Sequence, residues 1–263
     1  MSQGRATAVD ASELLRESET DVLDRLHDAS PELLTRRLLQ TRVDRKFVMC
    51  RGQIPAFVER LAADHHLLRA AGSPAASYET CYFDTPDRRL YDDHRRGRMP
   101  RFKVRVRHQV ERRMTFLEIK KKGKDGRTDK ARLERTFHDS RLDGEGAEFI
   151  AAHSPLNAGQ LTPALWLGFQ RATVLSARTE ERVTVDWDFR FHAMDRTWAW
   201  ADVAIVEIKQ PRYHHDTPAV RALRRLGIRE TSISKYCAGI ATLSPLGANS
   251  FKPALRAVNR LSK

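Results

Sequence analysis

The sequence predicts an α+β protein in which a mostly antiparallel sheet of about eight strands is flanked by helices. Strand-like runs with alternating apolar and polar residues dominate the middle of the chain, and helical patterns lie at both ends. The alternation also gathers charge on one face: Lys103, Arg105 and Arg107 share one side of the run 101–107, and apolar residues share the other. Two further runs, Glu118-Ile119-Lys120 and Glu207-Ile208-Lys209, place a carboxylate and an ammonium group side by side in the same way.

The N-terminal part of the chain is predicted to be helical before the first strand begins. Residues 1–10 are expected to be disordered, and leucines at roughly helical spacing predict helix within 11–40. Ser30-Pro31 begins a second helix there, with serine as the cap and proline at the first position. A strand is then expected at 41–50, followed by an amphipathic helix at 53–68.

The rest of the chain alternates between predicted strands and helices. Residues 141–170 are expected to be mostly helical with loops, and 123–129 to be a polar loop. Further helices are predicted for a short turn after Thr85-Pro86-Asp87 and for residues 219–226, 234–243 and 251–261. Strands are predicted at 77–84, 97–109, 112–121, 131–137, 173–177, 182–191 and 203–209.

Composition restricts the partners and the cellular compartment. The 263 residues carry a formal net charge of +13, which indicates an anionic partner such as nucleic acid, polyphosphate, nucleotide or anionic lipid. Three cysteines without a CxxC pair do not predict a disulfide framework or a zinc site, and a reducing cytoplasm fits them. The polar N-terminus does not resemble a signal peptide, and no run is apolar enough to span a bilayer. We therefore expect a soluble, cytoplasmic protein, with room for membrane association through a membrane-protein partner.

Eight strands are enough to close into a barrel, and helices outside it would cover the apolar strand faces. The charged faces would then point inward, where unpaired buried charge is costly. Such an interior must hold water, ions or an anionic ligand. The competing interpretation is an ordinary antiparallel sheet with one solvated face, which gives the same alternation. The repeated pairing of basic residues with a nearby glutamate favours the charged interior.

Seven short motifs, taken together, resemble the VTC domain, the polyphosphate polymerase domain of the vacuolar transporter chaperone type, in the triphosphate tunnel metalloenzyme superfamily. The resemblance runs from about Arg42 to about Leu243. In chain order the motifs are Arg42-Val43-Asp44-Arg45-Lys46-Phe47-Val48, Tyr82-Phe83-Asp84-Thr85, Lys103-Val104-Arg105-Val106-Arg107, Phe116-Leu117-Glu118-Ile119-Lys120, Val183-Thr184-Val185-Asp186, Val206-Glu207-Ile208-Lys209 and Ser234-Lys235-Tyr236.

The resemblance implies an eight-stranded antiparallel tunnel whose basic wall binds triphosphate or polyphosphate, and whose acidic residues bind Mn²⁺ or Mg²⁺. It implies a tunnel domain at 41–245, after an N-terminal helical or disordered segment at 1–40 and before a basic C-terminal helix at 246–263. Glu207 is implied as the metal ligand, with Glu118 as a second acidic candidate. The implied phosphate ligands are Lys46, Lys103, Arg105, Arg107, Lys120, Lys130, Arg182 and Lys235.

These residue types suit phosphoryl transfer from ATP to a growing polyphosphate chain. Arginine grips phosphate oxygens with two donors, lysine supplies a compact charge, and hard metal ions prefer carboxylate and phosphate oxygens. The alternatives are a tunnel triphosphatase, a non-catalytic polyphosphate- or nucleotide-binding module, and a nucleic-acid binder. The last is favoured only by net charge, because the basic strands lack an aromatic stacking platform. ATP and polyphosphate are therefore the expected partners, no specific nucleic acid is expected, and the oligomeric state stays open.

Two departures from the family pattern affect the site. Asp44 stands where the opening strand usually carries glutamate, and Ser176-Ala177-Arg178 stands where Tyr-x-Arg is common. Other residues have plainer explanations. Lys103 could be a rim charge, Glu118 and Lys120 could pair across the sheet, Tyr82 and Phe83 fit a core, and Asp84 fits a turn cap. The pairs His65-His66 and His214-His215 lack a third ligand and are expected at the surface.

Overall fold

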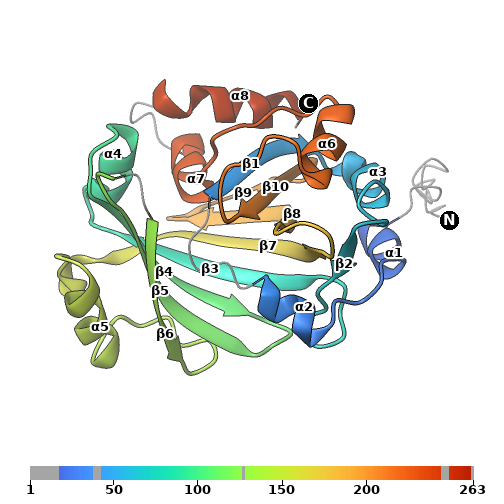
Figure 1. Cartoon of the computed structure of the whole chain (residues 1–263). Coiled ribbons are helices and arrows are strands. Elements are labelled where there is room, and N and C mark those ends of the chain that lie inside the picture. The colour runs from blue at the N-terminus through green and yellow to red at the C-terminus, as the bar shows by residue number, and fades with distance from the viewer. Residues whose placement is uncertain (1–17, 38–42, 126–127, 244–248, 262–263) are drawn as a thin grey trace, which may run out of the picture.

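The computed structural model describes residues 18–37, 43–125, 128–243 and 249–261 (Figure 1). Over these residues the chain forms one ten-stranded sheet with flanking helices, so the predicted α+β class is confirmed. The strands are β1 (Val43–Cys50), β2 (His65–Leu67), β3 (Ala76–Asp84), β4 (Arg101–Gln109), β5 (Met114–Lys122), β6 (Thr128–Arg135), β7 (Thr162–Ser176), β8 (Arg182–Ala193), β9 (Arg196–Trp200) and β10 (Val203–Gln210). The α-helices are α1 (Glu19–Asp24), α2 (Pro31–Arg36), α3 (Ile54–Glu59), α4 (Arg89–Arg95), α5 (Glu145–His153), α6 (Pro218–Arg225), α7 (Lys235–Leu243) and α8 (Lys252–Leu261).

Eight strands form the main path of the sheet, in the order β1-β10-β8-β7-β3-β4-β5-β6, and every pairing along it is antiparallel. The strands β2 and β9 extend β7 and β8. In the described part of the chain, the two edge strands of this path, β1 and β6, do not pair. Backbone hydrogen bonds therefore do not close the sheet into a complete barrel. A side-chain contact reaches across the interior instead, because Lys120 Nζ on β5 lies 3.7 Å from Asp44 Oδ2 on β1.

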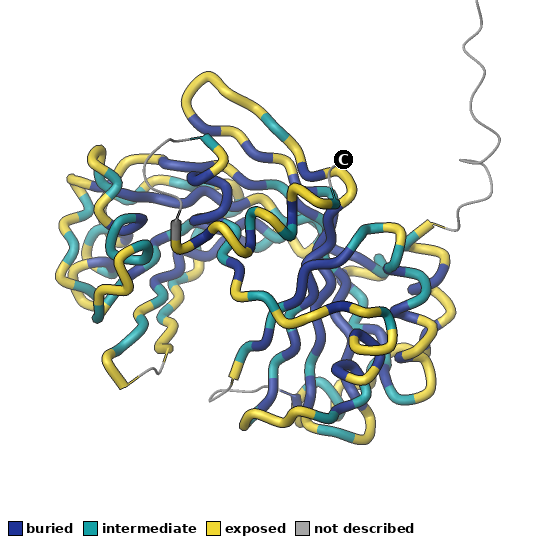
Figure 2. Tube along the Cα trace, turned by 90° about the horizontal axis from the view of Figure 1, so that it is seen from above, coloured by how far each residue is buried: buried dark blue, intermediate teal, exposed yellow. Residues whose placement is uncertain are grey.

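Two hydrophobic cores cover the outer face of the sheet, as the alternation predicted. The first joins α1, α3 and α6 to β1, β10, β8 and β7. The second packs Ile150 of α5 against apolar residues of β3, β4 and β5, including Val104, Leu117 and Ile119. Figure 2 follows this pattern, with buried positions along the strands and exposed positions mainly at turns, hairpin ends and helices.

The inner face of the sheet is divided into an apolar part and a charged part. Inner residues of β1, β7, β8 and β10, such as Val48, Leu165 and Ile205, pack against α7 and α8 in a third core. This packing brings the N-terminus of α7 over the sheet (Figure 1). The remaining inner face carries the charged residues described below.

Several predicted elements were wrong. Only 145–153 is an α-helix within the expected helical region 141–170, and 162–176 is the longest strand of the sheet. The apolar residues of this strand, β7, do not follow one alternation, because its first half packs inward at Leu165 and Leu167 and its second half packs outward at Ala172 and Val174. The helix expected at 53–68 ends at Glu59, because His65 and Leu67 pair with β7.

The N-terminal helices follow the predicted start signals where the structure describes them. Ser18 and Asp21 form a capping box at α1, and the Ser30 side chain accepts a hydrogen bond from Leu33 N–H, with Pro31 opening α2. The predicted helical residues 11–17 lie outside the described range. The strand β9 was not predicted at all.

Candidate active site

The first charged wall comes from β4, β5 and β6. Lys103, Arg105 and Arg107 face inward from β4, because the alternate residues Phe102, Val104 and Val106 belong to the outer core. Opposite them, Glu118 is the register partner of both Arg105 and Arg132. Strand alternation has therefore produced the shared basic face that the sequence predicted.

Glu118 lies among three cations. Arg105 Nε donates to Glu118 Oε2 over 2.6 Å, Arg107 Nη1 lies 4.0 Å from the same oxygen, and Lys130 contacts Glu118 Oε1. Although burial opposes ionisation, Arg105, Arg107 and Lys130 hold the pKa of Glu118 far below its usual value. Both oxygens of this carboxylate are therefore occupied by the basic residues that it positions. Glu118 and Lys120 do not pair with each other, since Lys120 contacts Asp44.

The second charged wall comes from β1, β10, β8 and β7. Glu207 is the register partner of Lys46 on one side and Thr184 on the other. Lys209 Nζ lies 3.2 Å from Glu207 Oε2 as an ion pair, without hydrogen-bond geometry. Burial opposes ionisation of Glu207, but Lys209, Lys46, Arg171 and Lys235 keep its pKa well below the usual value. Glu207 is thus an ionised carboxylate with a neutral hydroxyl as one strand neighbour.

Asp186 is the other carboxylate of this wall. Arg171 grips it with two hydrogen bonds of 2.5 and 2.7 Å, and Lys235 Nζ donates to Oδ2 over 2.6 Å. The side chain is fully buried, and Arg171 and Lys235 lower its pKa to about 2 against the effect of burial. Asp186 therefore fixes two cations at the inner surface.

The start of α7 joins the two walls. Lys46 Nζ of β1 donates to the Ile233 carbonyl over 3.1 Å, and Lys103 Nζ of β4 donates to Ser234 Oγ over 2.9 Å. Lys235 follows directly and reaches Asp186. Three lysines from distant parts of the sequence consequently meet at one helix N-terminus, where the helix dipole also favours anions.

A buried carboxylate holds α7 in this place. Tyr236 Oη donates to Asp84 Oδ2, and the same carboxylate accepts from the backbone N–H groups of Leu90 and Tyr91 at 2.8 and 2.9 Å. Asp84 therefore caps α4 and anchors the residue after Lys235. It also accepts from Thr85 N–H over 2.8 Å, in the turn where a cap was predicted. We call this group the Asp84–Tyr236 anchor. Tyr82 and Phe83 are buried, as expected of core residues.

All eight predicted phosphate ligands lie on strands or helix ends that face the interior. Lys103, Arg105, Arg107, Lys120 and Lys130 belong to the first wall. Lys46 and Lys235 belong to the second, and Arg182 lies at its end as the register partner of Lys209. Lys103 is held by Ser234 in the interior, so it is not a rim charge.

The charged interior residues that sequence reasoning missed include Arg171, Asp186 and Lys209. Asp186 and Lys209 belong to two of the seven motifs. Asp186 shares a strand face with Thr184, and Lys209 shares one with Glu207, so strand alternation could have predicted that both face the interior. Arg171 lies between the helical region predicted at 141–170 and the strand predicted at 173–177, whereas the structure has one strand, β7, across both. The side chain of Arg178, in the 176–178 segment, is 74% exposed and pairs with Asp64 outside the interior.

One histidine prediction was wrong. His65 is fully buried, and its Nε2 lies 3.1 Å from Glu181 Oε1, because β2 draws it under the outer helices. His214 and His215 are exposed, as predicted.

The interior lowers the basicity of several lysines. Burial lowers the pKa of Lys103, Lys130 and Lys209 to about 8, since water no longer stabilises their ammonium groups fully. A bound anion would offset this cost. The interior is therefore suited to a polyanion.

The donor set suits a metal ion that the substrate helps to bind. The described residues contain no group of three or more His, Cys, Asp or Glu side chains able to hold a metal alone. Mg²⁺ and Mn²⁺ commonly take one or two carboxylates and complete their shell with phosphate oxygens and water. Glu207 fits this requirement, and the buried hydroxyl of Thr184 beside it lacks a hydrogen-bond partner among the described residues.

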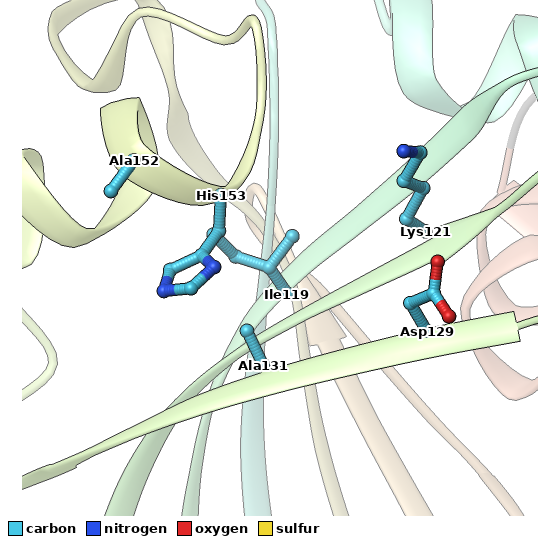
Figure 3. Close-up of a pocket in the computed structure, with 6 residues that line it drawn as sticks. All are labelled: Ile119, Lys121, Asp129, Ala131, Ala152 and His153. Atoms are coloured by element: carbon cyan, nitrogen blue, oxygen red, sulfur yellow. The ribbon is translucent and has the colours of Figure 1, made fainter. Parts of the chain in front are cut away.

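A separate hollow of about 240 Å³ lies between β5, β6 and α5 (Figure 3). Ile119 and Lys121 line it, with Asp129, Ala131, Ala152 and His153. Because Ile119 belongs to the outer core, this hollow is on the side of the sheet opposite to the charged walls. Lys121 and Lys120 therefore point to opposite sides of one strand.

Comparison with known proteins identifies the family. The profile of the VTC domain matches residues 41–244, most of the chain, so the chain belongs to the VTC domain family, as the sequence resemblance predicted. No curated protein sequence matches it. Solved structures with similar folds include a candidate adenylate cyclase from Bacillus halodurans, at 14% identity and TM-score 0.49, covering 74% of this chain and 95% of that one. A candidate adenylyl cyclase from Hippeastrum with a dominant triphosphatase activity has 13% identity and TM-score 0.48, over 78% and 99% of the two chains.

No helix in the described ranges is both long and apolar enough to cross a membrane. The cytoplasmic location remains a prediction.

Proposed function

We propose that this VTC domain is an ATP-dependent polyphosphate polymerase that transfers the γ-phosphate of ATP to the end of a polyphosphate chain. The observation that carries the proposal is the charge balance of the interior. Among the described residues, the basic side chains that line it include Lys46, Lys103, Arg105, Arg107, Lys120, Lys130, Arg171, Arg182, Lys209 and Lys235. The carboxylates that accompany them are Asp44, Glu118, Asp186 and Glu207.

In the proposed reaction, a terminal phosphate oxygen of the acceptor chain attacks the γ-phosphorus of ATP. The bond from that phosphorus to the β–γ bridging oxygen breaks, and ADP leaves. Because charge in the transition state spreads over the phosphoryl oxygens, rate enhancement comes mainly from positioning and charge stabilisation. Arg105 and Arg107 are placed to grip phosphate oxygens, and Glu118 fixes their orientation.

A divalent ion held by Glu207 would neutralise charge on neighbouring phosphates when bound. Lys46 and Lys235 flank this carboxylate and would orient the phosphates beside it. The choice between Mn²⁺ and Mg²⁺ belongs to this proposal.

Hydrolysis is the second candidate, and the carboxylates argue against it. Asp186 and Glu118 are both held by hydrogen bonds or close contacts from cations, whereas Glu207 has an ion pair with Lys209 that lacks hydrogen-bond geometry. The opening strand of a tunnel triphosphatase usually carries two glutamates before its lysine. Here β1 has only one carboxylate, Asp44, before Lys46. A triphosphatase with a richer acidic site is therefore the less favoured function.

The test is to incubate purified protein with ATP and Mn²⁺ and to separate the products on a polyacrylamide gel stained for polyphosphate. A ladder with release of ADP is the expected result. Free phosphate without a ladder would identify a triphosphatase, and tight polyphosphate binding without turnover would identify a binding module. Lys120→Ala should reduce synthesis strongly. Its matched control is Lys121→Ala, on the outer face of the same strand, which should leave synthesis unchanged.

A further inference from the structure

Like charges face each other repeatedly at one end of the first wall. In the β4–β5 register, Arg101 pairs with Lys122, and Lys103 pairs with Lys120. Lys120 also opposes Lys130 on β6. Like charges directly opposite on neighbouring strands destabilise a sheet, so two consecutive pairs of this kind need a compensating anion.

The basic residues next to these pairs have side-chain partners within the chain. One step further along, Arg105 and Arg132 have Glu118 between them. Lys120 has Asp44, and Lys103 has Ser234. Arg101 and Lys122, by contrast, form no ion pair with any described residue of the chain. They are therefore the uncompensated end of the basic wall.

Arg101 and Lys122 lie on the inner face of the sheet. Phe102 is in the outer core, so the residues beside it in β4 point the other way. On β5, Ile119 and Lys121 line the hollow next to α5, which leaves Lys120 and Lys122 to the interior (Figure 3). The basic inner face consequently continues about 7 Å beyond Lys103, the separation of same-face residues on a strand.

His94 of α4 borders the same end. Its Nδ1 is buried and has no hydrogen-bond partner among the described residues. Burial, together with Lys103, Arg101, Lys46 and Lys122, lowers the pKa of His94 to about 2, so the ring stays neutral beside these cations. A neutral imidazole can donate a hydrogen bond to a phosphate oxygen without adding to the repulsion.

We propose that Arg101, Lys122 and His94 form an outer subsite for the part of a polyphosphate chain that extends past the central cations toward α4. The inference rests on the proposed function and specifies the path of its polyanionic ligand. A triphosphate is short enough to be held by the central residues alone. The outer subsite therefore contributes to the affinity for long chains and not to the affinity for triphosphate.

The test measures binding of tripolyphosphate and of polyphosphate tens of phosphates long, by calorimetry at several salt concentrations. The variants are Arg101→Ala, Lys122→Ala and their double variant, with Lys121→Ala as the control on the same strand. The double variant should bind the long chain about tenfold more weakly, with a salt dependence about 1.5 units shallower, because two phosphate contacts are lost. Tripolyphosphate affinity should stay unchanged. Lys122→Gln, which keeps the alkyl chain, should reproduce the loss of Lys122→Ala and guards against a folding defect.

Four results would overturn the proposal. The long-chain affinity of the double variant could equal that of the wild type, or both ligands could lose affinity equally. If the wild type bound neither ligand, the proposed function itself would fail and the outer subsite with it. Wild-type synthesis of polyphosphate with an unchanged double variant would contradict the subsite alone.

Discussion

The two charged walls of the interior contain the same Glu-Ile-Lys sequence and use it differently. Glu118 has arginine on both sides in the sheet, Arg105 on β4 and Arg132 on β6. Glu207 has Lys46 on one side and the hydroxyl of Thr184 on the other. Cations hold both oxygens of Glu118, whereas Glu207 has one ion pair, to Lys209 at 3.2 Å and without hydrogen-bond geometry. The comparison shows that strand neighbours, and not the local motif, decide how tightly cations hold a carboxylate.

The largest expected effect is on stability. Glu118→Ala removes the counter-ion of Arg105, Arg107 and Lys130, and breaking such a buried group commonly costs about 3–5 kcal/mol. Urea unfolding should show this loss, and tripolyphosphate should restore much of it by replacing the missing charge. Glu207→Ala is the matched comparison and should cost less. A larger loss for Glu207→Ala would reverse the roles assigned to the two carboxylates.

The next effect concerns turnover. Glu207→Ala should lower Mn²⁺-dependent synthesis by about 100-fold or more, since a bound metal supplies several kcal/mol of charge stabilisation. Tripolyphosphate binding measured without metal should persist, because the cations of both walls remain. Unchanged turnover would show that Glu207 does not hold the metal.

A smaller effect should come from the helix that joins the walls. Tyr236→Phe removes the hydrogen bond to the buried Asp84 carboxylate, which typically costs about 1.5–3 kcal/mol for a charged acceptor. Lys235 should lose its fixed position, so tripolyphosphate affinity should fall together with stability. In a double-mutant cycle with Lys235→Ala, the two losses of affinity should overlap; fully additive losses would make Tyr236 structural only. Tyr213→Phe, at an exposed position, is the control.

The smallest effect is a pH dependence with opposite signs for binding and stability. Burial lowers the pKa of Lys103, Lys130 and Lys209 to about 8, so these residues lose charge above that pH and tripolyphosphate affinity should decrease. Between about pH 8 and the usual lysine pKa, the unfolded chain binds more protons than the folded chain. The contribution of these lysines to stability should therefore rise with pH in that window. Titration calorimetry and urea unfolding across this range measure both trends, and affinity that rises with pH would contradict the assignment.

The sequence was sufficient for the first wall and insufficient for much of the second. Alternation in 101–107 and 116–120 correctly predicted the shared inner face, because each of those strands has one apolar side. Arg171 could not be found in the same way, since the residues before it on the same face of β7, such as Leu167 and Phe169, are apolar and pack in the inner core. The contact between Lys235 and Asp186 depends on how α7 packs over the sheet, and no local pattern encodes it. The register that separates Glu118 from Glu207 also required the structure.

The central claim is that the inner face binds a polyphosphate whose metal ion sits at Glu207. A crystal structure with tripolyphosphate and Mn²⁺, analysed by anomalous diffraction, tests it most directly. The account predicts one manganese peak at the Glu207 carboxylate, with phosphates on Arg105, Arg107 and Lys235. Manganese at Glu118, or phosphates only outside the two walls, would contradict it.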